Sequence, residues 1–317
     1  MKFPVFDLHC DTALALLGRD HTCTGNLREN AFHIDLQRGK KHPGYAQCFA
    51  CFTTVSKGRP GDLSPVTIFE KELAAVLSQL DQNSDLIRLA YSAGEIEENR
   101  SKGIMSALLT IEGTAGIDYN PDLLEDLYKI GYRITTLGWN EQNPLTGSCV
   151  TGGGLSELGR QYVREAQRVG MVVDVSHISD EGFWDIMQIT QKPIIASHSN
   201  SRAVWNVPRN LTDEMYRAIC QTGGTTGINL YSSFLGENPD IDTVCDHIFH
   251  FLDIAGDDRH ISLGADFDGC DELPVGISGV QDYDKLADRL LERGLTEDTV
   301  FRIFWSNGLG VIERCSM

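Results

Sequence analysis

Histidines and carboxylates stand at the ends of short apolar runs at widely separated places in this chain. His9 and Asp11 follow the first run two residues apart, and Glu112 closes a run far along the chain. In a strand, residues i and i+2 point to the same face, so we expect His9 and Asp11 to aim together. Leu8 and Cys10 would then point the other way. Further residues of this kind, in chain order, are His177, His198, Asp266 and Asp268.

Imidazole and carboxylate groups are ligands that suit Zn²⁺ and related divalent ions. A single open catalytic zinc usually keeps three protein ligands, which is fewer than this set offers. The set fits two metals about 3.5–4 Å apart, with one carboxylate bridging them. Such a pair lowers the pKa of a shared water and polarises a carbonyl or phosphoryl oxygen. Asp266 could then move protons as general base and acid.

Each of these residues also has a purely structural explanation. A lone histidine such as His177 is more often a hydrogen-bonded core residue, and Asp266 and Asp268 could cap the loop that follows them. Glu112 suits this explanation less, because a buried carboxylate needs a partner. Coincidence at five separate strand ends is a poor explanation for the whole set. A shared site is therefore the favoured interpretation.

The elements that must position these residues are eight apolar runs separated by segments with helical spacing. The runs are residues 3–7, 45–52, 104–111, 133–137, 171–175, 193–196, 225–230 and 261–265. Their continuous hydrophobicity is typical of parallel strands covered on both faces. Several helical segments end in glycine just before the next run, as at Gly131, Gly170 and Gly223.

This alternation predicts a (β/α)8 barrel, with residues 1–317 as one domain; an open doubly wound sheet is the alternative. Residues 56–103 hold more helix than one connection needs, so we expect a helical insertion there. An extra C-terminal helix is expected after Gly269. Polar residues at the C-terminal ends of barrel strands would converge on one site.

Composition excludes several kinds of partner. The formal charge is −18, from 27 basic and 45 acidic side chains, so nucleic-acid binding is not expected. No run of about 18 apolar residues occurs, which predicts no membrane span. The N-terminus shows no export signal, and we expect a cytoplasmic protein with reduced cysteines. Cys48 and Cys51 form a Cys-x-x-Cys pattern, but it lies inside an apolar run and favours a structural role.

Six motifs carry a resemblance that covers the whole chain. They are FDLHCDT, LLTIEGT, GMVVDVSHISD, PIIASHSNSRAVWNVPRNL, GINLY and ISLGADFDG, in this order between residues 6 and 269. Together they resemble the membrane (renal) dipeptidase family within the amidohydrolase superfamily. The resemblance implies a binuclear zinc dipeptidase on a (β/α)8 barrel, with Mn²⁺ or Fe²⁺ as possible replacements. Family members are often homodimers, and many accept a D-residue at the C-terminal position of the dipeptide.

The resemblance also implies roles for the metal ligands. His9 and Asp11 would hold the first metal, and His177 and His198 the second. Glu112 would bridge the two.

Substrate-handling roles follow in the same way. Asp266 would accept the proton of the bridging water and pass it to the departing amine. Arg209 would pair with the substrate's C-terminal carboxylate, a bidentate task suited to guanidinium. Tyr231 would lie beside the scissile carbonyl.

One position departs from the family pattern. Family members commonly carry a histidine after the fourth strand that contacts the substrate carbonyl. Here the stretch reads TTLGWNEQNPL, with Trp139 at that position, and Asn140 could supply a polar contact instead. The departure bears on substrate range and rate more than on the metal site.

Two other functions remain open at this point. A lactonase, deaminase or phosphotriesterase on the same barrel would keep the metals, but such relatives often bridge them with a modified lysine, whereas this chain has Glu112. A non-catalytic metal-binding relative would have no need of Asp266 as a proton shuttle.

Overall fold

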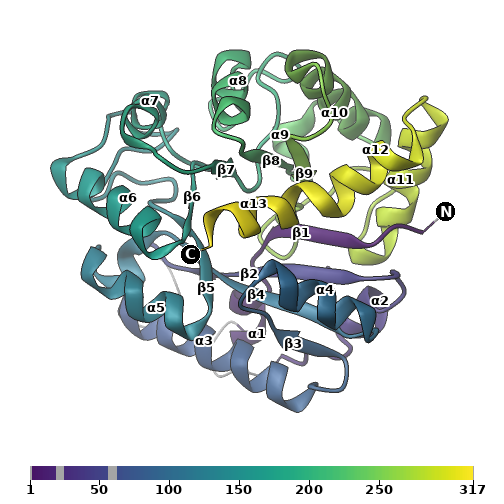
Figure 1. Cartoon of the computed structure of the whole chain (residues 1–317), viewed down its shortest axis with the longest axis horizontal. Helices are drawn as coiled ribbons and strands as arrows, with labels where there is room; N and C mark the ends of the chain where they lie inside the picture. Colours follow the sequence, from purple (N-terminus) through teal and green to yellow (C-terminus); the bar gives the residue numbers. More distant parts are fainter. Residues whose placement is uncertain (1, 19–24, 56–62, 317) are drawn as a thin grey trace.

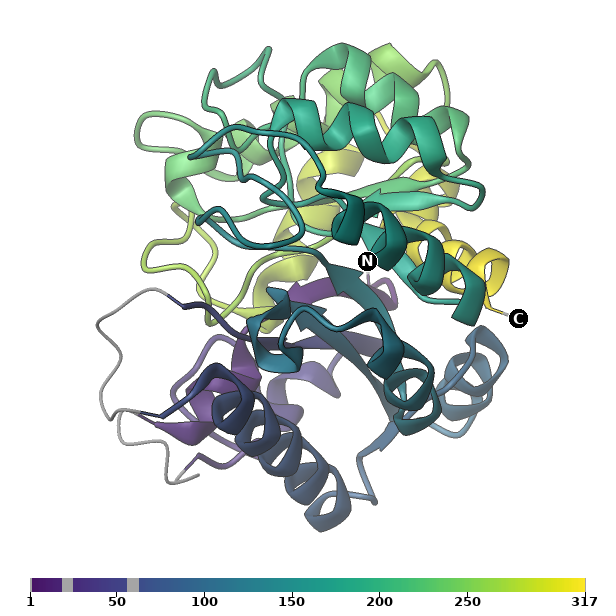
Figure 2. The same ribbon diagram turned by 90° about the vertical axis from the view of Figure 1, so that its left-hand side faces the viewer.

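Eight parallel strands close into a barrel with helices around it (Figures 1 and 2). The computed structural model describes residues 2–18, 25–55 and 63–316. The barrel strands are β1 (Val5–Cys10), β2 (Tyr45–Phe52), β4 (Met105–Glu112), β5 (Tyr132–Thr136), β6 (Val172–Asp174), β7 (Ile194–Ala196), β8 (Thr225–Ile228) and β9 (Ile261–Leu263). Neighbours run in the order β2-β1-β9-β8-β7-β6-β5-β4, and pairing of β2 with β4 closes the barrel. The predicted (β/α)8 fold is confirmed.

Helices cover the outside of the barrel and connect its strands. They are α1 (Thr12–Leu17), α2 (Leu36–Gly39), α3 (Pro65–Gln82), α4 (Ala93–Ser101), α5 (Leu124–Ile130), α6 (Glu157–Val169), α7 (Asp180–Ile189), α8 (Asp213–Gln221), α9 (Ser232–Leu235), α10 (Ile241–Ala255), α11 (Tyr283–Glu292), α12 (Glu297–Phe301) and α13 (Asn307–Cys315). Shorter turns are η1 (Thr114–Ile117), η2 (Pro121–Leu123), η3 (Val280–Asp282) and the π-helical η4 (Arg302–Ser306).

Helix α6 shows how the sequence sets these boundaries. The Ser156 hydroxyl accepts a hydrogen bond from the Gly159 amide at its start. Gly170 ends the helix with φ +93°, a left-handed conformation that glycine adopts at little cost. The predicted glycine ends are confirmed here and at Gly131, which ends α5.

The interior of the barrel has an apolar layer below a polar one. Alternate strand residues form the apolar layer, which comprises Phe6, Leu8, Ala46, Cys48, Leu108, Ile134, Val172 and Ile195. Two residues further along the same strand faces come Thr110, Thr136, Asp174 and Ser197, and Glu112 follows Thr110 by two more; all five are buried. The polar layer therefore lies toward the C-terminal ends of the strands.

The other end of the barrel is closed by the C-terminal helices. Figure 1 shows α13, in yellow, lying across the strands, and it contacts β1, β6, β8 and β9. Trp305, Val311 and Ile312 pack into the apolar cluster that contains Phe6 and Leu8. The predicted extra C-terminal helix is confirmed, and it covers the end of the barrel opposite the polar layer.

The insertion between β2 and β4 contains more than helices. After α3 comes a short strand, β3 (Ile87–Leu89), which pairs with β4 in parallel before α4 begins. This ninth strand was not predicted from the sequence. Residues 56–62, where the predicted insertion begins, lie outside the described residues.

A bulge near the end of β1 changes which way its residues point. Asp7 pairs with Gln47 and Cys10 with Phe49, so β1 has one extra residue against β2. Leu8 faces the inner cluster, whereas Cys10 belongs to the outer one. The expectation that these two residues share a face was therefore wrong, because the bulge interrupts the alternation.

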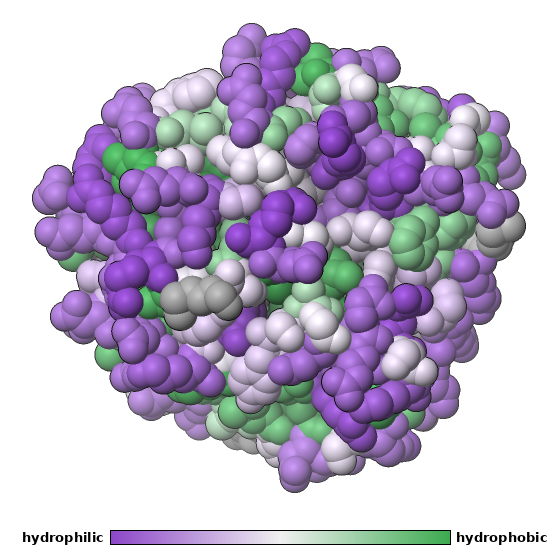
Figure 3. Space-filling view, in the orientation of Figure 1, coloured by the Kyte–Doolittle hydropathy of each residue, from purple (hydrophilic) through white to green (hydrophobic). Residues whose placement is uncertain are grey.

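The surface in the view of Figure 3 is mostly hydrophilic, with hydrophobic residues scattered among charged ones. Among the described residues, no helix is both long enough and apolar enough to cross a membrane.

Candidate metal centre

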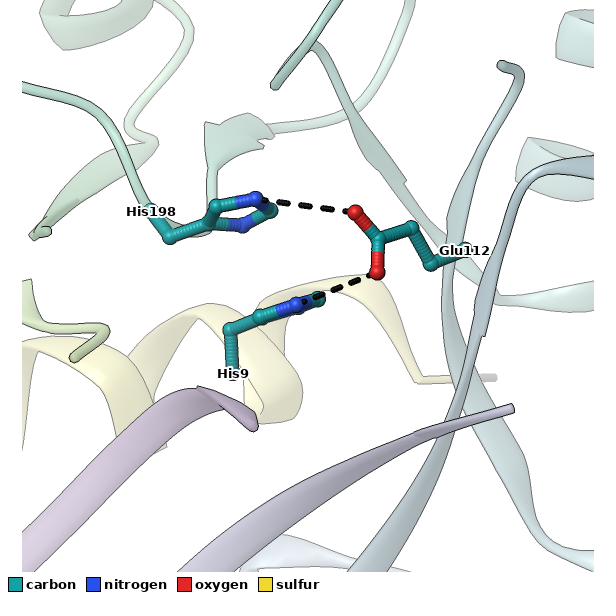
Figure 4. Close-up of side chains that lie close together, drawn as sticks. All are labelled: His9, Glu112 and His198. Atoms are coloured by element: carbon teal, nitrogen blue, oxygen red, sulfur yellow. Dashed lines mark ion pairs between the residues drawn. The ribbon is translucent and has the colours of Figure 1, made fainter. Parts of the chain in front are cut away.

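The carboxylate of Glu112 lies between histidines that come from opposite sides of the barrel. Its Oε2 is 3.3 Å from His9 Nε2, while its Oε1 is 3.0 Å from His177 Nε2 and 3.7 Å from His198 Nε2. Figure 4 shows the carboxylate of Glu112, at the end of β4, with one oxygen directed at His9 and the other at His198. One oxygen of Glu112 therefore lies near His9, and the other lies near His177 and His198.

The hydrogen bonds made by Nδ1 determine which ring nitrogen carries the proton in His177 and in His198. His177 Nδ1 lies 3.0 Å from the amide oxygen of Asn140, which can only accept a hydrogen bond. His198 Nδ1 lies 2.7 Å from Ser197 Oγ, whose own proton goes to Asp174 Oδ2. Both Nδ1 atoms are then donors, so both Nε2 atoms carry a lone pair.

Those two Nε2 atoms are 2.9 Å apart. Two lone pairs at this distance repel each other unless a positive charge lies beside them. An imidazole that ligates a metal characteristically donates its other N–H to a carbonyl, carboxylate or similar acceptor. His177 and His198 therefore have the hydrogen-bonding pattern of metal ligands, with Nδ1 donating and Nε2 left with a free lone pair.

A second group of ligand atoms surrounds His9. Its Nε2 is 3.6 Å from Asp11 Oδ2 and 3.8 Å from Asp266 Oδ1. His9 Nε2 and Asp11 Oδ1 are buried without a hydrogen-bond partner among the described residues. A Cβ on Gly269 would lie 2.1 Å from Asp11 Oδ2 and 2.5 Å from Asp266 Oδ1. Glycine at this position lets the backbone come close to both carboxylates.

The burial of these charges shifts their pKa values strongly. Burial raises the pKa of Asp266 to about 8 and that of Asp11 to about 6, and the neighbouring Glu112 carboxylate adds to both shifts. Burial alone would also raise the pKa of Glu112, but His9 and His177 hold it well below its usual range. Burial lowers the pKa of His177 to about 4, with Arg209 adding to the effect. Two buried carboxylates, Asp11 and Glu112, thus share one site with the mostly buried Asp266.

Two of the site residues have a backbone conformation that L-residues rarely adopt. His177 has φ +69° and Asp266 has φ +63°. Such conformations cost free energy and persist where the surrounding structure holds them, commonly at functional sites.

The donor set fits divalent metal ions. Carboxylates crowd against imidazole lone pairs, and buried ligand atoms of His9 and Asp11 lack hydrogen-bond partners. Within the part of the chain that the structure describes, two groups have ligand atoms within 4.8 Å of one another: one comprises His9, Glu112 and His198, the other His9, Asp11 and Asp266. A cation in either group would relieve the repulsion between carboxylates and satisfy the unpartnered atoms.

All five predicted metal ligands and Asp266 thus lie together. The structure also shows support that the sequence analysis missed, namely the hydrogen-bonded chain from His198 through Ser197 to Asp174. Asp174 further accepts hydrogen bonds from the amides of Ser176 and Ser197 and from the Thr136 hydroxyl. A hydroxyl residue directly before His198 and a carboxylate at the end of an apolar strand were the signals available.

Arg209 is buried beside the site and attached to it. Nη1 donates to Ser199 Oγ at 2.7 Å, and Nη2 donates to the backbone oxygen of His198 at 2.8 Å. Its Nε has no hydrogen-bond partner among the described residues, and its guanidinium lies over the Phe234 ring at 5.6 Å. Tyr231 packs edge-on against the same ring, with centroids 4.9 Å apart. Arg209 and Tyr231 therefore both contact Phe234.

Asp268, the second carboxylate at the end of the last apolar run, has hydrogen bonds of its own away from the metal centre. Its side chain is only 4% exposed. It accepts hydrogen bonds of 2.6 Å from the Thr12 hydroxyl and from the His33 amide. These contacts join the loop after β9 to two segments near the N-terminus, so a change at Asp268 alters buried structure.

Trp139 and Asn140 lie beside His177. Trp139 packs edge-on against Phe52, with ring centroids 5.1 Å apart, and lies 6.3 Å from the His177 ring. Asn140, predicted to contact substrate, makes the hydrogen bond to His177 described above. A contact between Asn140 and substrate remains a prediction.

Comparison with known proteins points to one family. Residues 1–316 match the family model described as membrane dipeptidase (peptidase family M19). An uncharacterised dipeptidase of Schizosaccharomyces pombe is 33% identical over 251 residues, which cover 77% of this chain but only 61% of that protein. An uncharacterised protein of Klebsiella pneumoniae, from the region 5′ of pqqA, is 32% identical over 80% of this chain and 97% of its own length.

Solved structures share the whole fold. A metallopeptidase from Rhodobacter sphaeroides, crystallised with a phosphinate mimic of the dipeptide L-Ala-D-Ala, superposes with a TM-score of 0.90. It is 26% identical, and the match covers 99% of this chain and 100% of that one. A dipeptidase of family M19 gives a TM-score of 0.87 at 27% identity, with 99% of both chains covered.

Proposed function

Because this chain belongs to the membrane dipeptidase family, peptidase family M19, we propose that it hydrolyses dipeptides at a centre of two divalent metal ions. The observation that carries this proposal is the position of Glu112, with one oxygen toward His9 and the other toward His177 and His198. A carboxylate placed in this way is suited to bridge two ions.

The proposed ligand sets are those that the family resemblance implies, and the closeness of His9 to Asp11 and of His177 to His198 supports them. His9 and Asp11 would hold one ion, and His177 and His198 the other. We propose zinc as the native metal, since imidazole and carboxylate ligands suit it, with Mn²⁺ or Fe²⁺ as replacements. Two such ions supply a Lewis acid for the scissile carbonyl and lower the pKa of water.

Asp266 is proposed to move the proton during hydrolysis. Its Oδ1 faces His9, and its Oδ2 accepts a hydrogen bond of 3.1 Å from Asn229 Nδ2. Asn229 fixes the orientation of the carboxylate, which leaves Oδ1 toward the centre. A carboxylate held there can take a proton from the attacking water and give one to the departing amine.

Arg209 is proposed to bind the C-terminal carboxylate of the dipeptide. Its two hydrogen bonds fix the plane of the guanidinium, and a buried guanidinium donor without a partner favours an anionic ligand. Tyr231, which contacts the same Phe234 ring, is proposed to lie beside the scissile carbonyl. The R. sphaeroides relative was crystallised with a mimic of L-Ala-D-Ala, which supports a D-residue at the C-terminal position here.

The experiment that tests this function is a hydrolysis assay on the purified chain with added Zn²⁺, Mn²⁺ or Fe²⁺. The substrates should include L-Ala-L-Ala, L-Ala-D-Ala, their amides, and a lactone and a phosphotriester. We expect metal-dependent cleavage of free dipeptides. Cleavage of the lactone or the phosphotriester alone would assign the chain to another amidohydrolase activity, and binding of metal without any cleavage would indicate a non-catalytic relative.

We further propose a homodimer, on the basis of the family resemblance. Sedimentation of the metal-loaded protein tests the oligomeric state.

A further inference from the structure

The loop between β5 and α6 contacts His177 and the residue after it at three places. The Cys149 amide donates to the His177 backbone oxygen at 2.8 Å. Ser148 forms a β-bridge with Ile178, the next residue. The third contact is between side chains, where Asn140 Oδ1 lies 3.0 Å from His177 Nδ1. The loop is thus placed to fix both the backbone and the imidazole of His177.

This loop is held together internally at the same point. The Ser148 hydroxyl donates to the backbone oxygen of Asn140 at 2.9 Å. Ser148, which bridges to the backbone beside His177, therefore also fixes the segment that carries Asn140. Because His177 has φ +69°, its backbone needs such support. The position of Asn140 against the imidazole is accordingly well defined.

The amide oxygen of Asn140 determines which ring nitrogen of His177 carries the proton. An amide oxygen accepts hydrogen bonds and cannot donate them, so His177 Nδ1 must be the donor. Nε2 is then unprotonated, and it is the atom that lies 3.0 Å from Glu112 Oε1. We propose that Asn140 is a positioning residue that presents Nε2 of His177 to the metal centre. The inference rests on the metal centre proposed above and adds a residue that supports one of its ligands.

His198 depends on a different support. Its Nδ1 is hydrogen-bonded to Ser197 Oγ, which donates to Asp174. Neither residue makes a described hydrogen bond to Asn140. Loss of the Asn140 acceptor should therefore affect His177 and leave the tautomer of His198 unchanged.

The other orientation of the Asn140 amide would place the proton of His177 on the other ring nitrogen. If the amide of Asn140 were turned round, its Nδ2 would donate to His177 Nδ1, and the ring proton would move to Nε2. That proton would then point at Glu112 or at His198 Nε2, 2.9 Å away, and His177 could not ligate a metal through Nε2. The two arrangements differ in a measurable property, the tautomer of one imidazole.

Zinc affinity of the full-length chain, measured by competition with a chelator, tests the proposal. Asn140→Leu removes the acceptor at similar size, and we expect one of the bound ions to be held about 10–100-fold more weakly while the other is unchanged. Asn140→Asp keeps an acceptor at the same place and should retain wild-type affinity or exceed it. Gln142→Leu, at an exposed position in the same loop, is the matched control and should have no effect.

Nitrogen NMR of the zinc-loaded protein provides the second readout, with the His177 signals assigned through His177→Gln. We expect protonated Nδ1 and unprotonated Nε2 in the wild type and in Asn140→Asp. Wild-type zinc affinity for Asn140→Leu, or an equal loss in both Asn140 variants, would overturn the proposal, as would a proton on Nε2 in the wild type. A wild-type chain that binds no zinc would overturn the metal centre and this inference together, so the two failures are distinguishable.

Discussion

His177 and His198 face each other through Nε2 atoms 2.9 Å apart, although each ring is hydrogen-bonded at Nδ1 to a different acceptor. His177 cannot shift its proton to Nε2 without losing its hydrogen bond at Nδ1, and His198 cannot do so without taking the Ser197 hydroxyl away from Asp174. The oxygen of Glu112 that lies nearest adds negative charge to the same place. A cation is the simplest partner for all three groups.

Asp266→Asn should stop catalysis without emptying the centre. Asparagine keeps the size of the side chain and the hydrogen bond with Asn229, but it cannot accept a proton. We expect turnover to fall by about 10²–10⁴-fold or more, with zinc content near the wild-type value. Kinetic assays and elemental analysis of the same preparations check this. Asp271→Asn, an exposed carboxylate in the same loop, should behave as wild type. Loss of metal in Asp266→Asn would instead make Asp266 a ligand.

Asp268→Leu should destabilise the fold. Leucine removes both carboxylate oxygens, so the His33 amide is left without its acceptor inside the fold and the Thr12 hydroxyl loses its hydrogen bond to Asp268. The cost of such an unmatched buried group is about 1–3 kcal/mol in the free energy of unfolding. Urea denaturation measures it. An unchanged unfolding midpoint would contradict the structural role assigned to Asp268.

Arg209→Lys should discriminate against substrates that carry a free carboxylate. A lysine ammonium cannot reproduce the planar fork, and lost hydrogen bonds to a charged group are worth about 1.5–3 kcal/mol, or roughly 10–100-fold in kcat/KM. The loss should appear with dipeptides and be much smaller with dipeptide amides. Arg202→Lys is the control, since Arg202 pairs with Asp180, and it should leave the ratio of acid to amide unchanged. If Arg209→Lys lowered kcat/KM equally for the dipeptide and for its amide, the proposed contact with the substrate carboxylate would be wrong.

His247 should make stability depend on pH. Burial lowers its pKa, against the opposing effects of its hydrogen bond to Leu235 and of Asp246. Its unfolded value is about 6.5, so the unfolded chain takes up a proton first as pH falls. The free energy of unfolding should therefore be steady above about pH 7.5 and decrease as pH falls through 6.5 toward the lower folded pKa.

The measurement is urea denaturation between pH 8 and pH 5 for the wild type and for His247→Asn. Asparagine can still accept the hydrogen bond from the Ser201 amide but does not titrate. The variant should be less stable at pH 8 and lose less stability on acidification. Equal losses in both proteins would show that His247 does not contribute.

The sequence was sufficient for the eight barrel strands because each is a continuous apolar run. It did not indicate β3, whose three residues Ile87–Leu89 are too few to show periodicity and are only partly buried. The bulge in β1 was also invisible, since it arises from the pairing of Asp7 and Cys10 with residues of β2. Pairing between strands distant in sequence is not encoded in any local pattern.

The predicted metal ligands were brought together because strand ends in a barrel meet at one edge. Their supports could not be predicted in the same way. The contact between Asn140 and His177 and the chain from His198 through Ser197 to Asp174 depend on side-chain positions within about an ångström. The partners of Asp268 could not be predicted for the same reason, because Thr12 and His33 are far away in sequence.

Titration of metal-free protein with Zn²⁺, with hydrolysis of a dipeptide followed at each step, tests the two-metal dipeptidase most directly. We expect activity to rise until about two equivalents of zinc are bound per chain, as the two-metal mechanism requires. Glu112→Gln should lower both the stoichiometry and the activity, because its amide nitrogen cannot ligate the second ion, whereas the exposed Glu237→Gln should titrate as wild type. Full activity at one equivalent, unchanged in Glu112→Gln, would contradict the bridged centre, and no dipeptide hydrolysis at any zinc level would contradict the function.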